Sequence, residues 1–101
     1  MAAIAVAVLV MGCGPATHSA TGIVVAVEQA SLTDIRSFTL RTETGQELTF
    51  RVGALDLSRG TFPANHLREH MATASAVAVA YTVEDGMSVA VRLVDATRLQ
   101  P

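Results

Sequence analysis

Two histidines and a glutamate within residues 62–72 have the types and the spacing of a metal-dependent hydrolytic site. His66 and His70 are four residues apart, so on a helix their rings lie one turn apart on the same side and could bind one metal ion. Glu69 lies between them and could position a water molecule. The segment therefore raises the hypothesis of metal-assisted hydrolysis.

The pattern His66-x-x-Glu69-His70 resembles the signature of the inverzincin metalloproteases. The resemblance implies a third ligand, a glutamate many tens of residues further on, but the only glutamate after His70 is Glu84, in a predicted turn. Because a catalytic zinc needs three protein ligands, we do not expect a protease. The sequence also has no G-x-S-x-G nucleophile elbow, and its acidic residues are scattered through turns and outward strand positions, so no other enzyme is expected. A weaker Zn²⁺ or Cu²⁺ site on His66 and His70, with His18 as a further ligand, is kept as the alternative function.

A short amphipathic helix is predicted to carry the two histidines. Pro63 suits the first turn of a helix, where a missing N–H costs nothing. The apolar residues that recur at helical spacing and form one stripe are Ala64, Leu67, Met71 and Ala74. His70 falls at the edge of this stripe and His66 further round, so both rings are expected at a half-exposed rim.

The chain from Gly22 onward alternates between apolar and polar residues, which is typical of half-buried strands. Strands are predicted over residues 22–28, 37–42, 46–52, 76–83 and 87–94. Gly45 and the "EDG" at 84–86 mark two tight hairpin turns. The residues predicted to share the inner face in the first three strands are Ile23, Val25, Val27, Phe38, Leu40, Leu48, Phe50 and Val52. In the last hairpin they are Val77, Val79, Tyr81, Val83, Met87, Val89, Val91 and Leu93.

The order strand, strand, strand, helix, strand, strand resembles that of the OB-fold, a five-stranded Greek-key barrel. The resemblance covers residues 22–97 and rests on element order. It implies a mainly β fold, a small five-stranded OB-like barrel with one short helix between strands three and four that plugs one open end. A five-stranded SH3-like barrel is the alternative, since its short helical turn precedes the last strand.

The N-terminal part of the chain has the pattern of a targeting signal. The uncharged apolar run at residues 2–11 is too short to span a bilayer and has the length of a signal-peptide core. It leads into Val10-Met11-Gly12-Cys13, which resembles the lipobox of bacterial lipoproteins, where the cysteine is lipidated. The alternative is a buried strand at residues 2–11 with Cys13 as a free core thiol.

The lipobox resemblance implies a division of the chain and a location. Residues 1–12 are expected to be a signal peptide, 13–21 the lipidated cysteine with a flexible tether, 22–97 the barrel domain and 98–101 a tail. The protein is expected to be exported and anchored to the membrane or envelope through lipid on Cys13. No basic residue precedes the apolar run, a departure that a start codon assigned too late would explain.

Binding of nucleic acid is not expected. OB-type sites stack bases on exposed aromatic rings in a basic groove, but Phe38 and Phe50 are in register with core leucines. The formal net charge of −2 also produces no field that attracts a polyanion.

The predicted function is a non-catalytic binding or assembly module for an envelope protein or a small ligand, with no cofactor. Its expected contact surface is the outward face of the second and third strands together with the two longest loops, which are regular places for binding residues. The candidate residues are Asp34, Arg36, Thr39, Arg41, Thr49, Arg51, Asp56 and Arg59.

Overall fold

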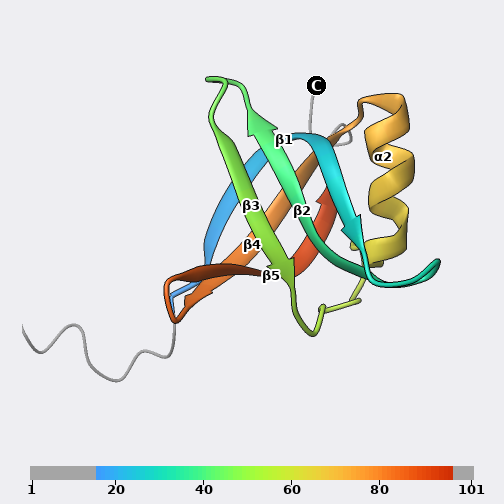
Figure 1. Ribbon diagram of the computed structural model, residues 1–101. Coiled ribbons are helices and arrows are strands. Elements are labelled where there is room, and N and C mark those ends of the chain that lie inside the picture. The colour runs from blue at the N-terminus through green and yellow to red at the C-terminus, as the bar shows by residue number, and fades with distance from the viewer. Residues whose placement is uncertain (1–15, 97–101) are drawn as a thin grey trace, which may run out of the picture.

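Alternating apolar residues fold the chain into five strands that close on themselves (Figure 1). This computed structural model describes residues 16–96. The strands are β1 (His18–Gln29), β2 (Ile35–Thr42), β3 (Glu47–Val52), β4 (Ala76–Glu84) and β5 (Met87–Asp95). Their spatial order in the closed barrel is β1-β2-β3-β5-β4. The predicted mainly β class, the small five-stranded closed barrel and the single short helix between the third and fourth strands are confirmed.

The long, bent strand β1 belongs to both halves of the barrel. Its first half pairs antiparallel with β4, from His18 opposite Tyr81 to Ile23 opposite Ala76, and its second half pairs antiparallel with β2. The barrel closes through a short parallel contact of β3 with β5, in which Arg51 lies opposite Val89. The bend between its two halves lets β1 pair with β4 along one part of its length and with β2 along the other.

Strand β1 begins earlier than predicted. Residues 18–21 were expected in a flexible tether, but the structure places them in β1, hydrogen-bonded to β4. The sequence there is small and polar because most of these side chains face solvent. The tether boundary drawn at residue 21 is therefore wrong by four residues.

The predicted inner face of β1 is also wrong in its first half. Gly22 and Val24 are buried, whereas Ile23 and Val25 are half-buried. A β-bulge between Val24 and Ala26 leaves Val25 without a partner residue on β2 and reverses the alternation, so that Val27 packs against the core again. A prediction that assumes strict alternation of inward and outward residues cannot detect such an extra residue.

The predicted helix lies between β3 and β4 as a 3₁₀ turn, η1 (Ala64–His66), followed by α2 (Leu67–Thr73). It packs beside β1 (Figure 1). Leu67 is its one fully buried side chain, and Met71 packs partly against the core. The helix ends at Ala74, which adopts a left-handed conformation and donates its N–H to the Met71 carbonyl. No helix within residues 16–96 is long and apolar enough to cross a membrane.

The core is built of branched aliphatic side chains around two phenylalanines. Phe38 and Phe50 lie opposite each other on β2 and β3 with ring centroids 5.3 Å apart. Phe50 also meets the edge of Tyr81 at 4.9 Å. Both phenylalanines are buried as predicted, and this leaves the outer face of β2 and β3 without an aromatic ring.

Some predicted core positions are instead exposed. Val83 and Met87, assigned to the inner face of the last hairpin, are about half exposed at its turn. A bulge on β5, opposite the step from Ala80 to Tyr81 on β4, shifts the register of the two strands by one residue. Val91 is the extra residue and is only half-buried, while Ala90 takes its place in the core.

Candidate functional site

The histidine pair of the metal hypothesis takes part in packing. The His70 ring stacks on buried Phe62 with centroids 4.4 Å apart and planes inclined by 11°. Its Nδ1 lies 3.0 Å from the His66 carbonyl oxygen. A carbonyl oxygen can only accept, so Nδ1 carries the proton and donates it. The His70 side chain is 13% exposed, so the expected half-exposed rim is wrong for His70 and right only for the exposed His66.

The ligands that a metal ion would need do not gather in the described part of the chain. Nδ1 of His70 is engaged, and its Nε2 lies 3.9 Å from Oδ2 of Asp95. The His18 ring packs at a tilt against the Tyr81 ring at the start of β1. Within residues 16–96 no group of three or more His, Cys, Asp and Glu side chains is placed to hold a metal ion. The arrangement gives His70 a structural role.

Replacing His70 by alanine should lower the free energy of unfolding by about 1–2 kcal/mol, because it removes an aromatic stack and a hydrogen bond. His66→Ala, at an exposed position with a ring 6.1 Å from Phe62, is the control and should change stability by less than about 0.5 kcal/mol. Urea unfolding followed by circular dichroism measures both. A Zn²⁺-dependent rise in the midpoint that His66→Ala removes would instead support a metal site.

The predicted ligand face is split between two hollows in the surface. The first, of about 840 Å³, is lined by Arg41 among others. The second, of about 540 Å³, takes in Arg36, Thr49 and Arg51. Thr39 lines neither hollow, and its hydroxyl oxygen is 3.0 Å from that of Thr49.

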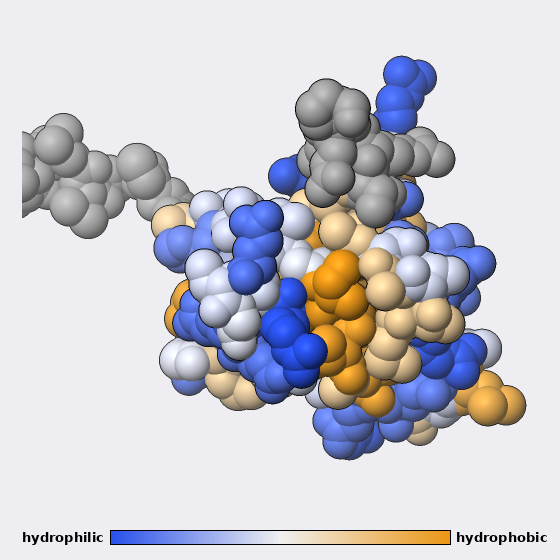
Figure 2. Space-filling view, turned by 90° about the horizontal axis from the view of Figure 1, so that it is seen from above, coloured by the Kyte–Doolittle hydropathy of each residue, from blue (hydrophilic) through white to orange (hydrophobic). Residues whose placement is uncertain are grey.

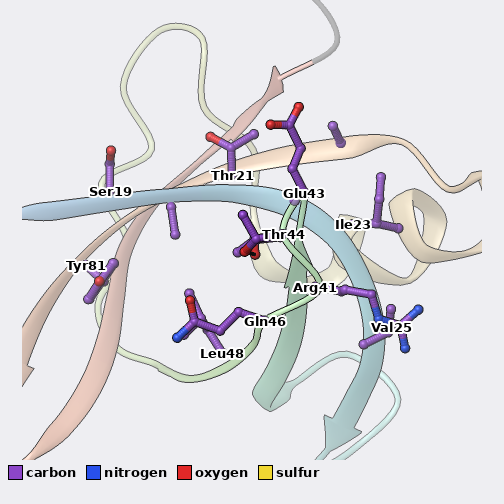
Figure 3. A pocket seen from close by; sticks show the side chains of 14 residues that line it. Ser19, Thr21, Ile23, Val25, Arg41, Glu43, Thr44, Gln46, Leu48 and Tyr81 are labelled. Carbon is purple, nitrogen blue, oxygen red and sulfur yellow. Dashed lines mark hydrogen bonds between the residues drawn. The ribbon is translucent and has the colours of Figure 1, made fainter.

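The first hollow is an apolar groove around β1 and the turn between β2 and β3. Figure 3 shows Leu48, Gln46 and Tyr81 to one side of β1, with Arg41 beside Val25 further along the strand. Viewed from above, hydrophobic surface is exposed between polar side chains (Figure 2). Sequence reasoning missed this groove because it assigned Ile23 and Val25 to the core.

Arg41 is already paired within this groove. Its Nε and Nη2 both donate to Oε2 of Glu47, at 3.2 and 2.9 Å. Glu47 lies directly opposite Arg41 in the β2–β3 pairing, so the ion pair follows from the register. Arg41 is therefore the least available of the predicted arginines.

The second hollow, which we call the arginine hollow, lies on the outer face of β2 and β3 beside the turn between β4 and β5. Its lining residues are Glu28, Arg36, Ser37, Thr49, Arg51, Gly86, Met87 and Ser88. Glu28 on β1, Ser37 on β2 and Arg51 on β3 are directly opposite one another in the two strand pairings. A carboxylate, a hydroxyl and a guanidinium group therefore lie in one row across three strands.

Arg36 reaches the arginine hollow because of a β-bulge. Glu28 lies opposite Ser37, but the next residue, Gln29, lies opposite Ile35. Arg36 is thus the extra residue on β2. It is exposed, whereas Ile35 before it and Phe38 after it are buried. Bulges re-aim side chains in this way, and this one adds a second guanidinium to the hollow.

The two arginines of the hollow differ from Arg41 and Arg92 in having no acidic partner within residues 16–96. Arg41 pairs with Glu47, and Arg92 lies 3.9 Å from Asp56. Within residues 16–96 neither Arg36 nor Arg51 forms an ion pair, and Arg51 donates only to the Met87 sulfur, at 3.6 Å. A thioether is a weak acceptor, so most of the hydrogen-bonding capacity of both guanidinium groups is not used by partners within residues 16–96.

The remaining predicted residues lie outside both hollows. The Asp34 backbone closes the loop between β1 and β2 through hydrogen bonds with Ala30 and Ser31. The Asp56 carboxylate accepts the Ser58 N–H at 3.0 Å and shapes the loop after β3. Arg59 is exposed in that same loop. Of the eight candidates, only Arg36, Thr49 and Arg51 come together in the arginine hollow.

Glu28 and Met87 are the lining residues that sequence reasoning missed. Alternation after Val27 places Glu28 outward, but nothing local indicates that it shares a hollow with residues of β3. Met87 was assigned to the core. Comparison of the whole chain with protein-family models, with curated proteins and with solved structures finds no match.

Proposed function

We propose that this protein is an exported bacterial lipoprotein, attached to the envelope through Cys13, whose barrel is a non-catalytic binding module related to OB-folds. The anchor is inferred from the apolar run at residues 2–11 and the motif that ends at Cys13, which lie outside the described residues. The relation to OB-folds is supported by the strand order and by the helix between β3 and β4.

The observation that carries the binding function is the arginine hollow. It has the size of a site for a small ligand and combines two guanidinium groups without acidic partners with the hydroxyls of Ser37 and Thr49. It presents no aromatic ring on which a base could stack, which argues against a nucleic acid as its ligand. A charged, concave surface of this kind favours a polar ligand.

The lipid anchor is tested by Cys13→Ser in a bacterial host. The unaltered protein is expected to incorporate an alkyne-tagged fatty acid and to fractionate with membranes, because two or three acyl chains hold a protein firmly. Cys13→Ser should abolish the labelling and release the protein from membranes or leave its precursor unprocessed. Equal labelling and unchanged mobility of the variant would refute the anchor.

The binding function is tested with the full chain in an uncharged detergent, by backbone amide NMR during titration with a small-molecule extract of the cell envelope. Shift changes are expected to cluster at the arginine hollow and to disappear in Arg51→Gln. The control is Arg59→Gln, which removes an exposed arginine outside the hollow. Shifts confined to the groove around Ile23 and Val25 would place the site elsewhere.

A further inference from the structure

We propose that the arginine hollow binds a short peptide, or a similar zwitterion, through its free carboxylate and its free amino group. This inference rests on the proposed binding function and names the ligand class. It follows from the row of Glu28, Ser37 and Arg51 and from the way in which the two opposite charges of that row are kept apart.

The acid and the base of the row have neutral partners instead of each other. Oε1 of Glu28 accepts the Ser37 hydroxyl at 2.9 Å, and Arg51 donates to the Met87 sulfur. No ion pair joins Glu28 to Arg36 or Arg51 in the described part of the chain. Exposed opposite charges that share a hollow without pairing are both available to a ligand that carries the complementary charges.

The spacing of the row sets the length of the ligand. Neighbouring strands lie about 4.8 Å apart, so the backbones of Glu28 and Arg51, two strands apart, are separated by about 10 Å. An extended peptide advances about 3.3–3.6 Å per residue, so about three residues cover that separation. The hollow, at about 540 Å³, has room for a peptide of this size.

The hollow carries charges of both signs. Arg36 and Arg51 contribute two positive charges and Glu28 contributes one negative charge, so the hollow offers sites for both an anionic and a cationic group of one ligand. A carboxylate accepts two parallel hydrogen bonds from a guanidinium, and an ammonium group suits the second oxygen of Glu28. A phosphate dianion would have to approach the Glu28 carboxylate, which repels it. A ligand that carries both a carboxylate and an amine satisfies all three groups.

Trialanine is the probe that tests the ligand class. Titrated into the full chain in uncharged detergent, it is expected to shift the amides of Glu28, Arg36 and Arg51 with about millimolar affinity, as befits so small a ligand. Trialanine amide should bind at least about tenfold more weakly, because the charge-assisted hydrogen bonds of its carboxylate are lost. N-acetyl trialanine should also bind more weakly, and Glu28→Gln should abolish the difference between it and trialanine.

Variants and competing ions complete the test. Arg51→Gln is expected to weaken trialanine binding about tenfold or more, while Arg59→Gln leaves it unchanged. Inorganic phosphate that shifts the same amides more strongly than trialanine would overturn the ligand class, as would equal binding of trialanine and its amide. If an envelope extract shifts these amides but trialanine does not, the ligand class is wrong and the binding function stands. If neither shifts them, both are wrong.

Discussion

Gly22→Ala is expected to lower the free energy of unfolding by about 2–3 kcal/mol, the range for overpacking a tight site. Gly22 is buried where β1 crosses from β4 to β2 and pairs with both Val77 and Thr42. A Cβ atom there would overlap the Arg41 carbonyl oxygen and lie 2.8 Å from its carbonyl carbon. Because both obstructing atoms belong to the backbone, the strands themselves would have to separate.

Gly53→Ala is the matched control for this prediction. A Cβ at Gly53 would lie 2.7 Å from Cγ1 of Val89, an atom of a side chain that can turn or shift. We expect less than half of the Gly22→Ala effect, measured by urea unfolding of both variants under the same conditions. Equal losses would mean that the β1–β2 backbone contact at Gly22 does not limit stability.

Leu67→Ala is expected to cost about 3–4 kcal/mol, which is typical of a fully buried leucine replaced by alanine. Leu67 is the only fully buried side chain of α2 and is inserted into the core cluster. Helix propensity does not oppose the change, since alanine is at least as good a helix former as leucine. The loss therefore reports the packing of the helix against the barrel.

Arg68→Ala, one residue further along the same helix, separates packing from helix formation. Arg68 is exposed, and it donates a long hydrogen bond of 3.5 Å to the Gln29 side chain. Its replacement should change the free energy of unfolding by less than about 0.5 kcal/mol. A Leu67→Ala loss below about 1 kcal/mol would show that the helix does not plug the barrel as the structure indicates.

The order of the elements could be predicted from local patterns. Phe38, Leu40 and Phe50 alternate with polar residues, and the structure buries all three. The helix at residues 64–73 follows from Pro63 and the apolar spacing around Leu67. These patterns depend on neighbours in the chain, so they can be read without knowing which strands meet.

The errors at Ile23, Val25 and Val91 in the core prediction share one physical cause. The bulges at Val25 on β1 and Val91 on β5 each add one residue to one strand of a pair. An added residue reverses the inside and outside of everything beyond it, and its position depends on the partner strand. The groove lined by Ile23 and Val25 was missed for this reason.

The candidate site was predicted in part. Alternation correctly placed Thr49 and Arg51 on the outer face of β3. It could not show that Arg41 is paired with an acidic residue whereas Arg51 is not. The strand register distinguishes them, because Glu47 lies opposite Arg41 while Ser37 lies opposite Arg51. The metal hypothesis for His66 and His70 likewise considered one helix alone and could not include the stacking of His70 on Phe62.

The sequence by itself determined the five strands, the helix and their order, because hydrophobic periodicity is a property of contiguous residues. The tertiary structure decided which charges are paired and which are left available. Glu28, Arg36 and Arg51 come from three segments of the chain, and only the register of β1, β2 and β3, with a bulge at Arg36, brings them into one hollow. The physical reason is that register is set by packing across the whole barrel, and no local segment contains that information.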